Sequence, residues 1–448
     1  MSRAGATGKQ MEDIFLYCTY LCVGFLLLNL FKVGLKGKSI LLPSTLFAAM
    51  WAITSFGIYL VNQDAVDNNF PMKMTPTLMH IGEYQFNILL VCFAAFICAR
   101  IKMSGKTFFN VRNLAASSEI PYLVKNFRWV LYLLFILGMF RMFLVVSTVG
   151  FDLAAIRQLY FTQRTNFSSF DLNLMRFTQY VLQFAIFYVC ILGVNAAIRG
   201  ISIKKILLDF LLFMPYQMSF GGRLYIISFF VPFLISYMTI KFVNFKEFIK
   251  NRKELSRLLL LFSTVLALIV VMQGLKFERT SEQMNQKSNI GELFYTSSSY
   301  IHMKSLWNEI PPEESLKLGL GRNCSPWFTT KSPEYTKAMN KWKRHWNPAL
   351  ICIPTMIPDM YLDFGTIGSY IVYFIIFYLI ELYAMKTMHR FSFKGFIIYI
   401  LLCMFAFNTA SSNMSDNFRL LFIGILFINL FSYFFKTPKF KSRILCNT

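Results

Sequence analysis

Charged residues are scarce in this chain, and acidic residues are scarcer than basic ones. Only 15% of the 448 residues are charged, with 22 Asp and Glu against 45 Lys and Arg, whereas a soluble domain has about 25% charged residues. Hydrophobic residues make up 56% of the chain, and the mean hydropathy is +0.50. This composition excludes an ordinary soluble multi-domain protein and indicates one polytopic membrane domain.

Sequence patterns that hold a metal ion or a redox-active cysteine pair are also missing. No Cys-x-x-Cys or His-Glu-x-x-His pattern occurs, and the four histidines are scattered. Most of the cysteines lie in or near apolar runs, where Cys behaves as a small apolar residue. Cys324 and Cys352 share the one long polar segment, where an oxidising compartment would permit a disulfide that their spacing alone does not establish. We expect neither a metal nor a cofactor.

What the chain has in abundance is apolar runs of membrane-spanning length. A helix needs about 20 apolar residues to cross the hydrocarbon core of a bilayer. The first run lacks an Ala-x-Ala-like cleavage site and is followed by lysines, so we expect an uncleaved span there. The sequence predicts an all-α polytopic integral membrane protein with about eleven transmembrane helices, at 14–31, 40–61, 85–101, 128–149, 178–198, 205–220, 224–241, 257–275, 365–387, 395–412 and 418–435.

The net charge of +23 follows the order of these runs. Lys and Arg crowd every second connection, beginning with Lys32, Lys36 and Lys38 and ending with the C-terminal tail. This alternation is the positive-inside pattern of membrane proteins, so we expect these connections and the C-terminus to lie in the cytoplasm. Because topology accounts for the charge, we expect no nucleic-acid partner.

One long hydrophilic segment, 276–364, interrupts the apolar runs and falls on the face opposite the cytoplasm. We therefore divide the chain into an N-terminal transmembrane bundle of about eight helices (1–275), a large periplasmic loop with short amphipathic helices (276–364), and about three C-terminal transmembrane helices with a basic tail (365–448). A bilayer core excludes water, so such a loop indicates work on a water-soluble part of a substrate.

Several arginines fall on the outer face, where the positive-inside bias depletes them. Arg157 lies on a predicted short surface helix, Arg223 follows two glycines in a tight turn, and Arg279 follows a span. One interpretation is that these side chains are solvated or extend to the membrane surface. The other is that they bind an anionic group such as phosphate, which suits the planar guanidinium fork.

Arg141 differs because it lies inside an apolar run, about two turns short of the outer end. A charge at this depth costs at least a few kcal/mol unless it faces a polar cavity or a partner. A structural ion pair with Asp209 or Glu381 and a role in binding an anionic ligand are both open.

Aromatic residues of the long loop recur at helical spacing. Tyr335, Met339, Trp342 and Trp346 follow at i, i+4, i+7 and i+11, which is typical of an amphipathic helix. The helix can lie on the bilayer with its tryptophans at the headgroup level, or its rings can stack on the faces of sugar rings. The two interpretations can hold together.

Asp359 and Asp363 stand four residues apart and can share one helical face, as a carboxylate pair for acid–base chemistry requires. The alternative is that Asp363 caps a helix that starts at Phe364. Histidine side chains in general can act as bases near neutral pH, so His345 is a third candidate base, although a lone loop histidine is commonly just solvated.

These residues resemble the pattern of Wzy-type O-antigen or oligosaccharide repeat-unit polymerases. The resemblance rests on the early outer arginine, the Gly-Gly-Arg turn, the arginine after a span, Asn347 in Trp-Asn-Pro, and the run Tyr-Leu-Asp-Phe-Gly-Thr-Ile-Gly at 361–368. It covers the whole chain in topology, and the 361–368 run is its most specific motif.

The resemblance implies a metal-independent inverting glycosyltransferase of the membrane GT-C type at the periplasmic face of a bacterial inner membrane. It would transfer a growing glycan from undecaprenyl pyrophosphate to a new lipid-linked repeat unit, with a chain-length regulator as a further partner. The implied pyrophosphate-binding residues are Arg141, Arg157, Arg223 and Arg279; the candidate bases are Asp359, Asp363 and His345; and the glycan-binding residues are Trp342, Trp346, Asn347 and Tyr361.

Two other functions share parts of this sequence pattern. An O-antigen ligase has the same topology and a large loop, and composition does not separate it from a polymerase. A flippase for lipid-linked oligosaccharides would show internal repeats and charged groups deep in several spans. The chain shows no repeat, and its predicted spans are mostly free of charge apart from Arg141 and Asp209.

Overall fold

The computed structural model describes residues 14–32, 41–67, 76–104, 119–150, 169–200, 202–218, 224–241, 250–261, 263–264, 267, 356–389, 392–410 and 414–434. Every regular element in these ranges is a helix. The helices are α2 (Ile14–Lys32), α3 (Pro43–Asp67), α4 (Pro76–Lys102), α5 (Glu119–Phe127), α6 (Trp129–Val149), α8 (Ser169–Arg199), α9 (Ile203–Met218), α10 (Leu224–Lys241), α16 (Ile357–His389), α17 (Phe393–Asn408) and α18 (Met414–Phe434). A further helical segment covers 252–261.

Four stretches of helix among the described residues are long and apolar enough to cross a membrane: Pro43–Leu60, His80–Lys102, Leu123–Ser147 and Asp363–His389. Shorter apolar helices occur at Ile14–Asn29, Phe184–Arg199, Phe229–Lys241, Phe393–Asn408 and Asn417–Leu430. The all-α membrane class is therefore supported by length and composition. The count of eleven spans and the periplasmic loop stay predictions.

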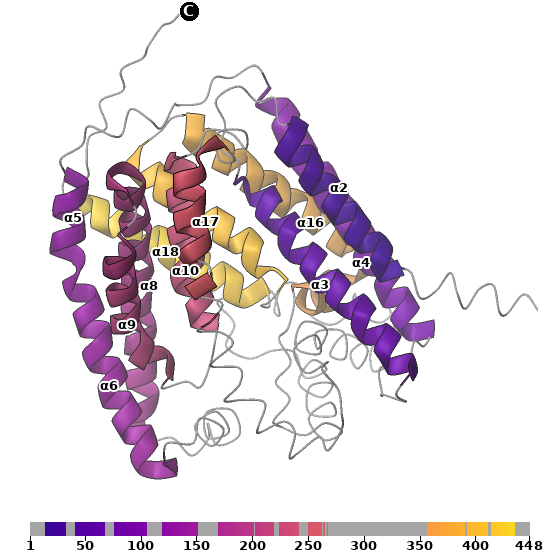
Figure 1. Cartoon of the computed structure of the whole chain (residues 1–448). Helices are drawn as coiled ribbons and strands as arrows, with labels where there is room; N and C mark the ends of the chain where they lie inside the picture. Colours follow the sequence, from indigo (N-terminus) through magenta and orange to yellow (C-terminus); the bar gives the residue numbers. More distant parts are fainter. Residues whose placement is uncertain are drawn as a thin grey trace, which may run out of the picture.

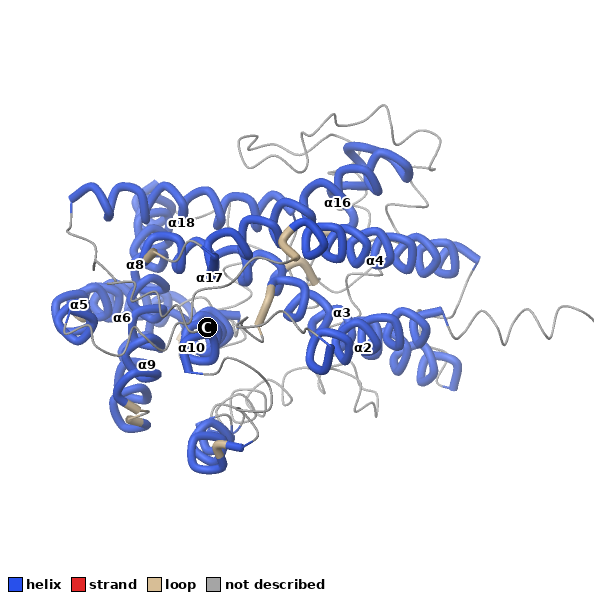
Figure 2. The backbone as a smooth tube through the Cα atoms, turned by 90° about the horizontal axis from the view of Figure 1, so that it is seen from above, coloured by secondary structure: helices blue, strands red, loops and turns tan. Residues whose placement is uncertain are grey.

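The helices pack as two groups that meet at α17 (Figures 1 and 2). In one group α2 lies along α3, and α4 lies along α16; in the other, α6 lies along α9, and α10 along α8. Helix α17 contacts α3 and α16 on one side and α18 and α10 on the other. Aromatic rings fill the first group, where the Phe47 ring meets those of Phe93, Phe96 and Phe377 at centroid distances of 5.9, 5.5 and 4.8 Å.

Large apolar side chains also cover much of the outside of these helices. Phe143 on α6 is 70% exposed, and Ile367 on α16 is 75% exposed. Leucine, isoleucine and aromatic side chains of α2, α4 and α18 are likewise exposed. Such wide apolar surfaces are uncommon on soluble monomers and suit helices that face lipid.

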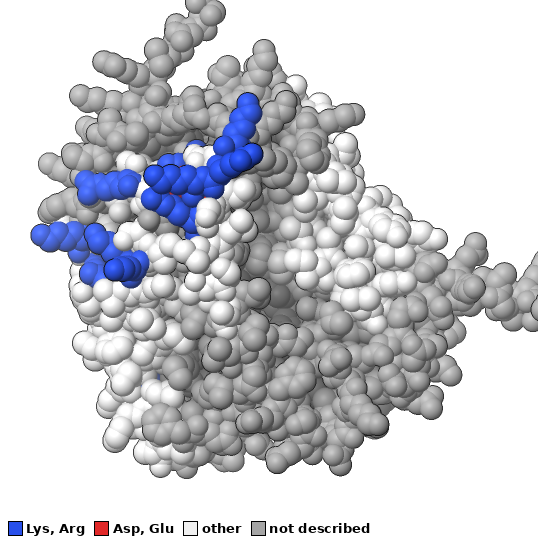
Figure 3. All heavy atoms as spheres, in the orientation of Figure 1, with Lys and Arg blue, Asp and Glu red and all other residues white. Residues whose placement is uncertain are grey.

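Charge divides the two ends of the bundle. One end of the bundle is the end at which α2, α4, α8, α10 and α16 finish and α3, α6, α9 and α17 begin. We call it the basic end. Figure 3 shows Lys and Arg side chains gathered there on one face. The described Lys and Arg side chains near this end are Arg100, Lys102, Lys125, Arg128, Arg199, Lys204, Lys205, Lys241, Lys250, Arg252, Lys253, Arg257, Lys386 and Lys394. Among the described Lys and Arg side chains, only Arg141 and Arg419 lie towards the opposite end, so the described basic residues gather at one end of the bundle.

Candidate functional site

The run that carries the resemblance contains a break in α16 at the end opposite the basic end. Gly365 has φ 65° and ψ −169°, so residues 357–364 form a short helix that is kinked against the rest of α16. Only glycine adopts this backbone region readily. The alternative in which Asp363 caps a helix starting at Phe364 is wrong, because Asp363 lies within the short helix and the non-helical residue is Gly365.

A hydrogen bond ties the start of this short helix to the end of α17, which is bonded in turn to α3. The Met356 N–H donates to the Thr409 carbonyl oxygen at 3.0 Å, and the Tyr373 hydroxyl donates to the Met356 carbonyl at 3.2 Å. The Trp51 indole N–H donates to the Thr409 hydroxyl at 3.2 Å. The point at which the chain returns to the bundle is therefore fixed against α3 and the end of α17.

Tyr361 lies in the core of this region. Its side chain is fully buried, and its ring meets Tyr84 of α4 edge-on at 5.6 Å between centroids. The Tyr84 and Ser369 hydroxyl oxygens lie 2.6 Å apart, and the Ser369 hydroxyl donates to the Thr366 carbonyl at 2.7 Å. Packing accounts for Tyr361 in this structure, and a contact with glycan stays a prediction.

Asp363 is the carboxylate that this arrangement encloses. It is 1% exposed. Asp359 lies one turn earlier in the same helical segment, so the four-residue spacing puts both positions on one face. The Asp359 side chain lies outside the described residues. An ionisable side chain inside a membrane bundle is by default a candidate functional residue.

Arg141 is buried in α6, at 4% exposure, towards the same end. Neither of the two carboxylates suggested as its ion-pair partner serves that purpose. The Asp209 carboxylate binds Arg128, and the Glu381 carboxylate binds Arg100. That structural alternative is therefore wrong in its choice of partner, and the predicted role of Arg141 in binding an anion stays open.

The other predicted site residues lie outside the described part of the chain, as do the two loop cysteines. They are Arg157, Arg223, Arg279, His345, Asn347, Trp342, Trp346, Cys324 and Cys352. Among the residues that are described, no group of three or more His, Cys, Asp or Glu side chains could hold a metal ion.

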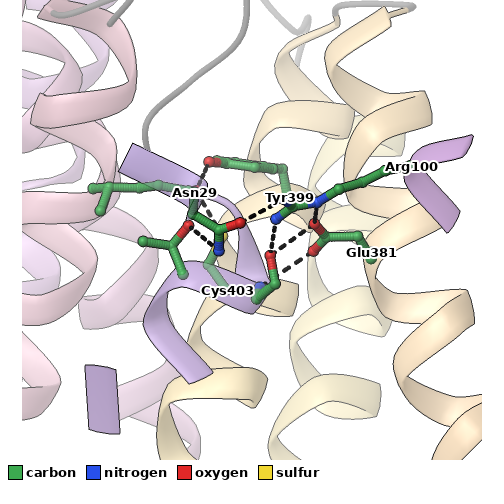
Figure 4. A network of polar contacts seen from close by, with 8 residues as sticks. Asn29, Arg100, Glu381, Tyr399 and Cys403 are labelled. Carbon is green, nitrogen blue, oxygen red and sulfur yellow. Dashed lines mark hydrogen bonds and ion pairs between the residues drawn. The ribbon is translucent and has the colours of Figure 1, made fainter. Parts of the chain in front are cut away.

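A buried polar network at the basic end was not expected from the sequence (Figure 4). The Glu381 side chain is fully buried and accepts hydrogen bonds from the Ser44 N–H at 3.2 Å, the Ser44 hydroxyl at 2.8 Å and the Arg100 Nε–H at 2.9 Å. Arg100 also donates to Asn29 Oδ1 and to the Ser44 hydroxyl. The Tyr399 hydroxyl donates to the Leu41 carbonyl beside them.

Two smaller networks lie at the same end. The Asp209 carboxylate pairs with the Arg128 guanidinium at 2.8 Å and accepts from the Tyr188 hydroxyl at 2.8 Å. The Glu254 carboxylate accepts from the Tyr237 hydroxyl at 2.7 Å. In all three networks the carboxylates have cationic or hydroxyl partners, so their arrangement is that of structural ion pairs.

The sequence contains charged residues in and beside apolar runs that indicate these networks, but the positive-inside pattern was taken to explain them. Glu381 and Asp209 each interrupt an apolar run, and Arg100 and Arg128 stand at the edges of such runs. The positive-inside pattern accounts for arginines at run edges without requiring that their side chains point into the core. A long Arg side chain can stand at the edge of an apolar run and still reach a carboxylate in the core, since its stem can follow apolar surface.

The candidate functional site is therefore the end opposite the basic end, around Asp363, Gly365 and the start of α16. Comparison of the chain with models of known protein families, with curated proteins and with solved structures finds no match.

Proposed function

We propose that the chain is a Wzy-type polymerase that joins lipid-linked oligosaccharide repeat units into polysaccharide at the periplasmic face of a bacterial inner membrane. The observation that carries this proposal is the position of the 361–368 run. The short helix that contains Asp363 contacts α4 and the end of α17 at the end of the bundle opposite the basic end.

The topology of the proposal follows from the charge asymmetry. If the basic end faces the cytoplasm, as the positive-inside rule favours, the Asp363 end faces the periplasm. The long loop 276–364 returns to the bundle at Met356, next to this end. A lipid-linked substrate then has its prenyl chain among the helices and its sugars beside the loop.

The chemistry needs a base and a cationic site. The acceptor hydroxyl oxygen attacks the anomeric carbon of the growing chain, the bond from that carbon to the pyrophosphate oxygen breaks, and the pyrophosphate leaves with the electron pair. A carboxylate takes the hydroxyl proton. We place Asp363 in this role, with Asp359 and His345 as the alternatives, because Asp363 is buried beside the Gly365 break at the end opposite the basic end. Arg141, Arg157, Arg223 and Arg279 would stabilise the departing pyrophosphate without a metal.

The test is the glycan ladder of a deletion strain that carries variant chains. Asp363→Asn removes the carboxylate and keeps the shape, and Arg223→Ala and Arg279→Ala each remove one cation. Each variant should lose long chains and retain single repeat units on the lipid acceptor, at wild-type levels of membrane protein. Glu83→Gln is the control, because this exposed carboxylate pairs only with His80 in the described part of the chain; it should give a wild-type ladder.

The outcomes separate the competing functions. A normal long-chain ladder from Arg223→Ala or Arg279→Ala would contradict the proposal. Loss of every repeat unit, including single units, from the deletion strain would assign the chain to a ligase or a flippase. Single units without long chains identify a polymerase.

A further inference from the structure

We propose that the surface around the α8–α9 turn is a binding site for the headgroup of an anionic phospholipid. We call this surface the basic corner and define it by six exposed side chains: Arg199, Lys204, Lys205, Lys250, Arg252 and Lys253. They come from the end of α8, the start of α9 and the start of the helical segment at 252–261. The inference does not depend on the proposed polymerase activity.

Contacts between three elements hold the basic corner together. The Lys241 ammonium, at the end of α10, donates to the Ala197 carbonyl of α8 at 3.5 Å and lies 3.8 Å from the Glu254 carboxylate. The Arg257 guanidinium lies 3.4 Å from the same carboxylate. It also lies 3.7 Å from where a Cβ on Gly200 would stand, directly at the α8–α9 turn. The cations therefore come from sequence-distant segments that meet at the C-terminal end of α8.

The charge of the basic corner is not neutralised by the described residues around it. Glu254 is the carboxylate of this region, and it is already bound by Lys241, Arg257 and the Tyr237 hydroxyl. None of the described ion pairs involves any of the six outer side chains. Uncompensated like charges repel one another, so a surface that gathers six of them favours an anionic partner.

Exposed leucines on the same helices favour a lipid as that partner. Leu208 and Leu211 of α9 are 49% and 55% exposed, and Leu259 and Leu260 of the segment 252–261 are 59% and 55% exposed. Along each helix, the leucines lie one to two turns beyond the cations, away from the basic end. The surface thus combines cations at the end with apolar side chains behind them, which matches the anionic headgroup and acyl chains of one phospholipid molecule.

The experiment measures lipid binding to the purified full-length chain by native mass spectrometry, with dioleoylphosphatidylglycerol as the probe and dioleoylphosphatidylcholine as the neutral comparison. The test variant is Lys204→Gln with Lys205→Gln. The matched control is Lys102→Gln with Lys386→Gln, which removes the same charge from exposed positions of the basic end on the other group of helices. Both variants change exposed side chains, and thermal unfolding of each confirms that it is folded.

We expect the test variant to bind phosphatidylglycerol about 25-fold more weakly, at roughly fivefold for each cation removed. The control variant should change this affinity by less than about twofold, because its charges lie away from the basic corner. Binding of phosphatidylcholine should be the same for all three proteins.

Two results would overturn the proposal. An equal loss in both variants, or none in the test variant, would mean that the whole basic end attracts anionic lipid without a defined site. Displacement of bound phosphatidylglycerol by an equal concentration of inorganic pyrophosphate would assign the basic corner to a diphosphate group instead of a phospholipid.

Discussion

Glu381 is the side chain whose removal we expect to destabilise the bundle most. Glu381→Ala leaves the Arg100 guanidinium, whose side chain is 15% exposed, without its carboxylate partner. It also leaves the Ser44 N–H, in the first turn of α3, without the acceptor that it has now. Removal of one partner from a buried ion pair costs about 3–5 kcal/mol, because the other charge stays buried. We therefore expect the free energy of unfolding to fall by about 4 kcal/mol.

The measurement is unfolding of the detergent-solubilised protein by titration with sodium dodecyl sulfate, followed by circular dichroism. Arg100→Met, Glu381→Met and the double variant Arg100→Met with Glu381→Met form a separate mutant cycle. The double variant should lose less free energy of unfolding than the sum of the two single variants' losses, because it buries no unpaired charge. Glu83→Gln serves as the control: its pair with His80 has side chains 48% and 61% exposed, so its loss should cost less than about 1 kcal/mol.

The reasoning would be refuted if Glu381→Ala unfolded within about 1 kcal/mol of the wild type. It would also be refuted if the two single substitutions added without coupling, since residues in one buried network should show an interaction energy of at least about 0.5 kcal/mol.

Two further predictions concern glycines. Gly365→Ala should straighten or strain the break beside Asp363, at a cost of about 1–3 kcal/mol of stability, and should shorten the glycan ladder. Gly24→Ala is its control, because there is open space around the Cβ position of Gly24. This control should leave the ladder unchanged and should leave stability unchanged or raise it slightly. Gly138→Ala would place a Cβ 2.4 Å from the Tyr216 backbone nitrogen, so it should push α6 away from α9 and lower the unfolding midpoint in the same titration. A wild-type midpoint for Gly138→Ala would contradict the close approach of these two helices.

The helices were predictable because hydropathy over about 20 residues is a strong local signal. Helices of the structure overlap each predicted run, with only part of 257–275 among the described residues. The membrane span after the long loop was predicted from 365, at the observed break, but the bounds of the short helix before it were not predicted, although Pro358 follows its first residue, Ile357. Proline is favoured in the first turn of a helix, so this position held a usable signal that the polarity of the loop obscured.

The candidate site was only partly predictable. Asp363 could be selected from its spacing to Asp359, but its burial could not, because the short helix that carries it packs against Tyr84 and Thr409, which come from distant parts of the chain. The pairing of Arg100 with Glu381 was beyond local pattern because 281 residues separate them. A single sequence shows that each charge needs a partner and does not show which one.

The Glu381 network also sets an order of events during synthesis. Ser44 and Glu381 are 337 residues apart, and translation adds about 5–20 residues per second. The start of α3 and the Arg100 guanidinium must therefore stay in the membrane for tens of seconds before their carboxylate emerges from the ribosome. The first helices cannot reach their final packing on their own, so the last quarter of the chain completes a structure that the first quarter has begun. A chain that ends before α16 would leave the Arg100 guanidinium with hydrogen bonds to Asn29 and Ser44 but without its carboxylate partner.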